Sequence, residues 1–414
     1  MDTKNFTGVL RNKNFTQLWT SQILSVFCAN MLNFALSYKI FTVTDRSFGV
    51  SMLYLAYYLP VYVIGLFSGV IIDHFSRRKL LVIANVFQAV CVLLYLFIGE
   101  SIILIYPIVF LYSFMDQFYL PSEAAYLPEL VEKEKLPAAN TFFNFAQFGG
   151  LFFGFVLGGP IMKLFGVNSP YYIASVFLWI AAISTYLLPK DNPPKPTNLL
   201  RENFTKRAKE NIFENIAFIT RRPKIYMSMF INLAFLMFNA VLAVTLPALG
   251  KELFNVDLLD LSWMLIFPLA VGAGVGALFV DRGVQNGGKQ RLITIGGFIS
   301  SIVLVFLYVT GQIANLVPFV SQNLPIFIIS LSGILGYAIS LIIIPTQVTL
   351  QEETPNELRG RVYGSQKLLQ GIFLVFPSVF AATFADLLGV GNLFLGIGVA
   401  VFIGALVSIK YKKK

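Results

Sequence analysis

The chain contains repeated runs of apolar residues, each about 20 residues long, and this feature limits its fold more than any other. A helix that crosses the roughly 30 Å hydrocarbon layer of a bilayer needs about 20 apolar residues, whereas soluble domains need no such repeated runs. The runs are unbroken rather than alternating, which favours helices over a membrane β-barrel. With 57% hydrophobic and only 13% charged residues, the composition agrees. The sequence therefore predicts an all-α integral membrane protein.

We predict twelve transmembrane helices in two bundles of six. The predicted spans are residues 16–41, 50–72, 80–98, 102–121, 141–163, 170–188, 224–248, 261–280, 292–311, 324–345, 362–386 and 391–409. The two bundles are expected at residues 1–188 and 224–414. A cytoplasmic linker at 189–223 joins them, first proline-rich and then basic. Its apolar residues recur every three or four positions, which favours an amphipathic helix on the membrane surface; a solvated linker is the alternative.

The basic residues are distributed unevenly between the two sides of the membrane. All but five of the 31 Lys and Arg residues fall on the side of the N-terminus, the exceptions being Lys39, Arg46, Lys163, Lys251 and Lys367. By the positive-inside rule, both termini are expected in the cytoplasm and the protein in the plasma (inner) membrane. The net charge of +10 is then a topology signal and an attraction to lipid headgroups, not a nucleic-acid footprint.

The two halves repeat the same features in the same order, as parallel repeats do. The fourth and tenth predicted spans both end in proline and an acid-rich loop, which begin at Pro121 and Pro345. The loop after span two reads Gly69-x-x-x-Asp73-x-x-x-Arg77-Arg78, and a looser copy follows span eight. This pattern resembles the major facilitator superfamily over essentially the whole chain. The loops after spans four and ten resemble its macrolide-efflux and enterobactin-exporter branch.

The resemblance implies a conformational latch on the inner side of the membrane. Its candidate residues are Gly69, Asp73, Arg77, Arg78, Glu123, Gly360 and Gly364. Asp73 would face the positive N-terminal end of span eleven, where the two glycines allow close approach. Arg77 would pair with Glu123 or, as second choice, with Asp116. The alternative is that the basic run only anchors the loop in the cytoplasm.

Charged residues inside the membrane cost about 2.5 to 3.5 kcal/mol each on insertion scales, so each one invites a reason. Asp116 in span four and Lys367 in span eleven are the candidates for proton coupling. The alternative for Asp116 is a structural ion pair with Lys367 or with the basic loop. Lys39 lies close enough to the outer end of span one to reach the interface.

Uncharged polar and small residues provide the remaining candidate positions. The amides expected to line a substrate cavity, or else to bond neighbouring helices, are Asn30, Asn33, Gln147, Asn232, Asn239, Gln366 and Gln370. The residues expected to pack a helix pair closely are Gly150, Gly154, Gly158, Gly159 and Pro160. The last set also resembles, in part, the glycine-proline signature of the family's antiporters.

Together these features predict a secondary transporter that works by alternating access, most simply a proton antiporter that exports a lipophilic small molecule. Uptake or flipping of a lipid, lysophospholipid or nutrient is the alternative. A membrane-embedded enzyme is the remote one, because one histidine and two separated cysteines offer no metal set or nucleophile-base pair. We expect a monomer whose partners are its substrate, a coupling ion and lipid, with no cofactor, metal or nucleic acid.

Overall fold

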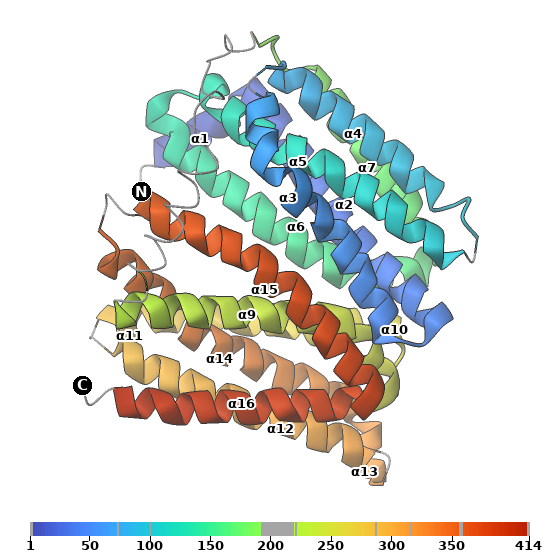
Figure 1. The fold of residues 1–414 in the computed structure, drawn as a ribbon, viewed down its shortest axis with the longest axis vertical. Coiled ribbons are helices and arrows are strands. Elements are labelled where there is room, and N and C mark those ends of the chain that lie inside the picture. Colours follow the sequence, from blue (N-terminus) through green and yellow to red (C-terminus); the bar gives the residue numbers. More distant parts are fainter. Residues whose placement is uncertain are drawn as a thin grey trace. The chain divides into compact units, whose positions relative to one another are not determined.

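The chain is helical throughout the part that the computed structural model describes (Figure 1). The structure describes residues 3–72, 74–99, 101–191, 219, 222–285, 288–314, 316–355 and 359–411, and contains no strand in these ranges. Nine helices there are long and apolar enough to cross a membrane, and a shorter apolar helix covers Phe373–Leu388. The chain divides into two compact units: Met1–Asp45 with Met52–Asn198, and Arg46–Ser51 with Leu199–Lys414.

Unit 1 holds six long helices, drawn from blue to green in Figure 1. Its elements are α1 Thr3–Leu10, α2 Lys13–Thr44, α3 Ser47–Ile72, α4 Arg77–Leu94, η1 Ile102–Leu104, α5 Ile105–Leu130, η2 Lys133–Lys135, α6 Leu136–Phe165 and α7 Ser169–Tyr186. Helix α2 starts at its N-cap residue Asn12, whose side-chain oxygen accepts from the backbone of Asn14 and Phe15. The Asn12 amide also donates to the Leu130 carbonyl, which ties the start of α2 to the end of α5.

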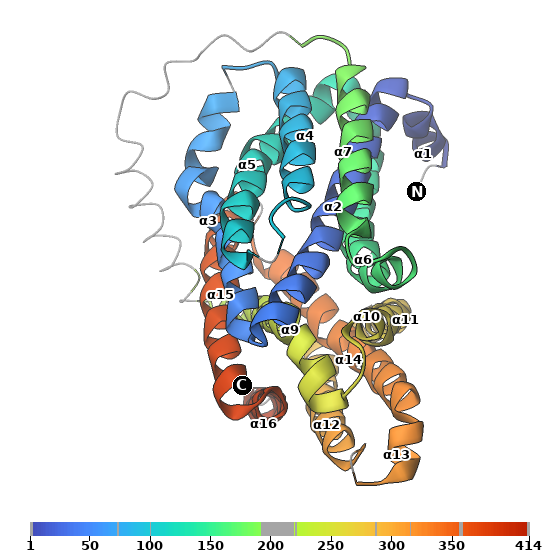
Figure 2. The same cartoon turned by 90° about the vertical axis from the view of Figure 1, so that its right-hand side faces the viewer.

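Unit 2 holds the second set of helices, drawn from yellow-green to red. Its elements are α9 Pro223–Ala248, the π-helical η3 Leu249–Phe254, α10 Leu258–Leu261, the π-helical η4 Ser262–Ile266, α11 Phe267–Gln285, α12 Lys289–Ala314, α13 Pro318–Gln322, α14 Leu324–Glu353, α15 Arg359–Leu388 and α16 Val390–Tyr411. Figures 1 and 2 both show α12 and α14 side by side, in line with their contact along the unit.

Several of the same helix pairs pack inside each unit. The first long helix contacts the fifth (α2 with α6, α9 with α15), and the third contacts both the fourth and the sixth (α4 with α5 and α7, α12 with α14 and α16). This internal repetition is the arrangement that two tandem copies of one six-helix bundle produce.

Each of the twelve predicted spans coincides with a helix, and the largest difference is at the end of the fourth. Residues 102–121 were expected there, but α5 continues through Pro121 and Pro128 to Leu130. Proline inside a membrane helix is tolerated when neighbours supply hydrogen bonds for the freed backbone groups. The helix predicted within the linker, with apolar positions from Leu200 to Ile219, lies outside the described residues except for Ile219, which is buried.

Candidate functional site

Helix α5 carries two acidic side chains, Asp116 and Glu123, well inside its length. They are seven residues apart, which places them two turns apart on one face of the helix. Glu123 is buried and Asp116 is partly buried. A carboxylate at such depth needs hydrogen-bond donors or a cation, so its contacts indicate what it can do.

Asp116 is held by one residue from each of two neighbouring helices. The Gln88 amide of α4 donates to Oδ1 at 2.7 Å, and the Tyr57 hydroxyl of α3 donates to Oδ2 at 3.1 Å. The same Gln88 amide donates to the carbonyl of Tyr112, one turn earlier on α5. The Ser113 hydroxyl donates to the carbonyl of Tyr57. Asp116 therefore lies where α3, α4 and α5 meet, and both of its oxygens accept from uncharged groups.

Whether Asp116 also forms an ion pair with Lys367 stays a hypothesis, because the Lys367 side chain lies outside the described residues. Its second predicted partner, the basic loop, contacts other groups. Arg77 donates to Glu129 and to the carbonyl of Ala125, and Arg78 donates to the carbonyl of Tyr186. Asp116 thus accepts hydrogen bonds from the uncharged donors Gln88 and Tyr57, and not from Arg77 or Arg78 of the loop.

The expected pairing of Arg77 with Glu123 is wrong. Arg77 forms its ion pair with Glu129, whereas Glu123 accepts a hydrogen bond from the Tyr119 hydroxyl at 3.2 Å. The physical reason is the length of α5. Because the helix continues to Leu130, its inner end lies more than two turns beyond Pro121. The acid that reaches the basic loop is therefore Glu129, which follows Glu123 in the sequence.

The start of α4 is stabilised by Asp191, which belongs to the predicted linker at residues 189–223. One Asp191 oxygen accepts from the Ser76 hydroxyl at 2.5 Å, and the other accepts from the backbone N–H of Arg77 at 2.5 Å. The guanidinium group of Arg78 also lies 4.9 Å from the ring centroid of Tyr186. An anion at the positive N-terminal end of a helix is favourable. The start of α4 therefore contacts the end of unit 1 in two ways, through the side chain of Arg78 and through the backbone N–H of Arg77 that Asp191 caps.

The other latch candidates cannot be joined to this set. Asp73 lies outside the described residues, and so do the surroundings of Gly69 in α3 and of Gly360 and Gly364 in α15. The latch between Asp73 and span eleven stays a prediction.

Most of the candidate cavity amides bond within their own helix or lie buried. Asn30, Asn232 and Asn239 each donate to the carbonyl four residues earlier. Asn232 also accepts from Gln347 of α14 at 3.2 Å. Asn33 and Gln366 are buried, Gln370 is partly buried, and Gln147 is exposed. A role in binding substrate stays a prediction for all seven.

The glycine column of α6 lies against α2. A Cβ atom on Gly154 would lie 2.8 Å from the carbonyl oxygen of Phe27, and one on Gly150 or Gly158 would meet Val26 or Phe34 at 2.8 or 2.7 Å. Gly159 is also buried, and Pro160 is partly buried inside the helix. These positions have the geometry of close helix packing.

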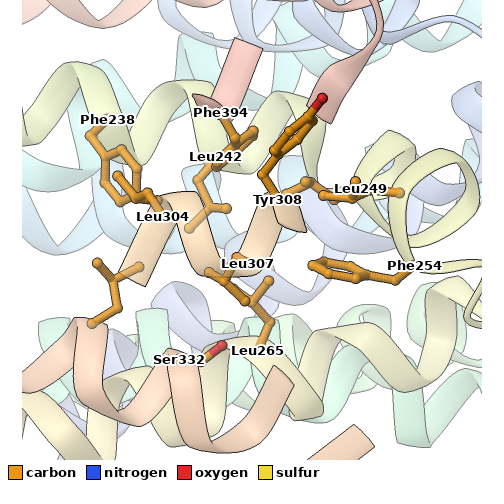
Figure 3. Close-up of a pocket in the computed structure, with 12 residues that line it drawn as sticks. Phe238, Leu242, Leu249, Phe254, Leu265, Leu304, Leu307, Tyr308, Ser332 and Phe394 are labelled. Carbon is orange, nitrogen blue, oxygen red and sulfur yellow. The ribbon is translucent and has the colours of Figure 1, made fainter. Parts of the chain in front are cut away.

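Unit 2 contains an apolar pocket of its own (Figure 3). Its lining is made of aliphatic and aromatic side chains together with the hydroxyl groups of Ser332 and Tyr308. The residues are Phe238, Leu242, Leu249, Leu253, Phe254, Leu265, Leu304, Leu307, Tyr308, Ser332, Leu335 and Phe394. The Ser332 oxygen is buried and has no hydrogen-bond partner within the described residues. The cavity is small, with a volume of about 20 Å³, and its lining is apolar.

Comparisons with known proteins agree over most of the chain. The chain is 23% identical to the MFS-type transporter YfiS of Bacillus subtilis, covering 88% of this chain and 84% of that one. It is 21% identical to macrolide efflux protein A of Streptococcus pyogenes, covering 95% and 94%. It is 24% identical to the multidrug efflux pump Tap of Mycolicibacterium fortuitum, covering 85% and 84%.

Solved structures of transporters have the same fold. The nucleoside transporter NupG matches with a TM-score of 0.69 at 12% identity, covering 96% of this chain and 99% of that one. A POT family transporter matches with a TM-score of 0.71 at 9% identity, covering 99% of both chains. These matches and the helix pairing show that the chain has the fold of these transporters. Because the family profile "Major Facilitator Superfamily" matches residues 18–376, the chain belongs to the major facilitator superfamily.

Proposed function

We propose that the protein is a secondary active exporter of a lipophilic small molecule, driven by proton antiport and working by alternating access. The names of the efflux relatives support the direction of transport, and two of them match over at least 84% of both chains. The substrate is proposed to be lipophilic because the efflux relatives are named for macrolide and multidrug export. The distribution of its basic residues supports an orientation with both termini in the cytoplasm, and a monomer in the plasma membrane is part of the same proposal.

The observation that carries the coupling role is the environment of Asp116. An ionised carboxylate can accept both of the hydrogen bonds that Tyr57 and Gln88 donate. A protonated carboxyl must donate one, and Gln88 has an acceptor for it, because its buried Oε1 has no partner within the described residues. Both protonation states of Asp116 therefore have suitable partners at this position.

Proton binding at Asp116 would change contacts on three helices at once. In the ionised state Tyr57 of α3 and Gln88 of α4 both donate to α5. In the protonated state one of these donors must turn away or the Gln88 amide must rotate. A group whose charge changes the contacts between helices is what coupling a proton to a conformational change requires.

Drug accumulation in bacteria stripped of their own efflux pumps tests this proposal. The cells express the wild type, Asp116→Asn or the control Glu132→Gln, which alters an exposed surface acid paired with Lys135. Intracellular levels of erythromycin and ethidium are then measured with and without an uncoupler. We expect lower levels with the wild type and the control than in cells that lack the protein. With Asp116→Asn, or with the uncoupler, the levels should equal those of cells that lack the protein.

Other outcomes separate the parts of the proposal. Export that survives the uncoupler contradicts proton antiport. Export that survives Asp116→Asn assigns Asp116 to packing. If the protein is present in the membrane but no compound level changes, drug export is rejected, and uptake or flipping of a lipid or nutrient takes its place.

A further inference from the structure

Glu123 is the only charged side chain that is buried among the residues that the structure describes. It is 3% exposed, and its expected partner Arg77 donates instead to Glu129 and to the carbonyl of Ala125. A buried carboxylate without a cation depends on hydrogen bonds to remain ionised. Its hydrogen bond comes from Tyr119, one turn earlier on α5.

Tyr119 is the first member of a chain of buried polar groups. Its hydroxyl lies 2.9 Å from the Ser21 hydroxyl of α2. The Asn85 amide of α4 donates to Ser21 at 3.1 Å, and the Ser25 hydroxyl of α2 donates to the Asn85 carbonyl oxygen at 3.1 Å. All of these side chains are buried. The chain therefore connects Glu123 to both α2 and α4.

The donors in this chain all point toward Glu123. A tyrosine hydroxyl has one hydrogen, and that of Tyr119 is directed to Glu123, so Ser21 must donate to Tyr119. Asn85 in turn donates to Ser21 and accepts from Ser25. A series of aligned hydrogen bonds that ends on a carboxylate favours the ionised form, because each bond polarises the next.

Protonation of Glu123 would reverse this order. The new O–H group becomes a donor to Tyr119, which then donates to Ser21, and Ser21 donates to Asn85. The Asn85 amide has to rotate by half a turn, so that its oxygen accepts from Ser21 and its nitrogen donates to Ser25. Without that rotation a buried hydroxyl loses its partner, which is unfavourable.

We propose that Glu123 is a second proton-binding carboxyl, and that the chain Tyr119–Ser21–Asn85–Ser25 transmits its protonation state to α2 and α4. This inference rests on the proposed proton coupling and adds a second binding position to it. The charged group that acts on Glu123 is Asp116, two turns earlier on α5. The remaining side chains packed around Tyr119 include Leu18 of α2, Leu81 and Ala84 of α4 and Ala139 of α6, which carry no charge.

Infrared difference spectroscopy of the full-length protein in lipid nanodiscs tests the proposal without a transported compound. The carbonyl stretch of a protonated carboxyl is followed as the pH is changed. We expect a titrating band for each of the two carboxyls, and the band of Glu123 is the one that disappears in Glu123→Gln and remains in Asp116→Asn. In Glu123→Asp the band should move rather than vanish, which shows that loss in Glu123→Gln is not loss of the fold.

The hydrogen-bond chain is tested by its own variants. Ser21→Ala and Asn85→Leu should each move the midpoint of the Glu123 band by about half a pH unit or more, since each removes a link that ends on the carboxyl. The matched control is Ser175→Ala, because Ser175 is also buried in unit 1 but donates to the backbone of Ala89. Its midpoint should equal that of the wild type.

Two results would overturn the inference. The first is the absence of a band assigned by Glu123→Gln over the whole pH range in which the protein is folded. The second is a Glu123 midpoint that Ser21→Ala and Asn85→Leu leave unchanged. By contrast, a Glu123 band that responds to both variants, together with drug export that ignores Asp116→Asn, supports this inference and rejects only the coupling role of Asp116.

Discussion

The second and fourth long helices of unit 1 meet through polar side chains. Tyr57 of α3 donates to Asp116 of α5, and Ser113 of α5 donates back to the carbonyl of Tyr57. Gln88 of α4 completes the contact. These bonds join ionisable or rotatable groups, so they can be exchanged when a proton binds.

The corresponding helices of unit 2, α11 and α14, meet through their backbones. A Cβ atom on Gly272 would lie 1.9 Å from the carbonyl oxygen of Gly333, and one on Gly336 would lie 1.8 Å from that of Leu269. Such a contact has no alternative arrangement that protonation can select. Among the described residues, the contact between the second and fourth helices thus includes a carboxylate in unit 1 and is made by backbone atoms in unit 2.

The largest effect is expected from adding a methyl group at the backbone contact of unit 2. Gly336→Ala forces α11 and α14 apart, and we expect a cost of about 3 kcal/mol or more in the free energy of unfolding. The control is Gly274→Ala on α11, where a Cβ atom meets nothing within 4 Å. Thermal unfolding in detergent measures both. Equal melting temperatures would mean that the two backbones are not in close contact.

An intermediate effect is expected when one buried hydroxyl is removed from each unit. Ser21→Ala takes a partner from Tyr119 and from Asn85, which should cost about 1 to 2 kcal/mol of stability. Ser332→Ala removes a hydroxyl without a partner in the described part of the chain, so stability should stay equal or rise by up to about 1 kcal/mol. Unfolding of the two variants side by side gives the answer, and a larger loss at Ser332 would contradict the contrast between the units.

The smallest effects are expected from the ion pairs at the helix ends. Glu129→Gln weakens the pair with Arg77, whose side chain is only 13% exposed, and should cost about 1 kcal/mol. Glu353→Gln weakens the pair with Lys224, which is 70% exposed, and should change stability by less than about 0.5 kcal/mol. Melting at low and high salt distinguishes them, since screening acts mainly on the exposed pair. Equal losses would contradict this order.

The helices could be predicted from the sequence because their signal is local. About 20 consecutive apolar residues can satisfy their backbone in a membrane only as a helix, and each predicted span lies on one. The end of α5 could not be placed in this way. Pro121 was interpreted as a helix end, as it would be in water, but the helix passes through it and through Pro128.

The site was only partly predictable, because its partners are distant in sequence. Asp116 was selected as a charge in an apolar span. Asp116 accepts hydrogen bonds from Tyr57 and Gln88, and Tyr119 bonds with Ser21. The two residues in each of these contacts are 28 to 98 positions apart in the sequence. Single polar residues do not recur at a regular spacing, so the sequence does not indicate which residues they contact. The position of an acidic residue within an apolar span predicts that the residue has a role. Only the packing of α2, α3, α4 and α5 shows which residues Asp116 and Glu123 contact.

The cap that Asp191 forms on α4 has a consequence for how the two halves of the gene can be separated. Unit 1 is completed by a residue that follows its last helix, because Asp191 lies beyond the end of α7 at Tyr186. A polypeptide that stops before this residue lacks the anion at the start of α4, whereas one that includes it carries all the contacts of that helix end. The natural junction for a split or shuffled transporter therefore lies after Asp191.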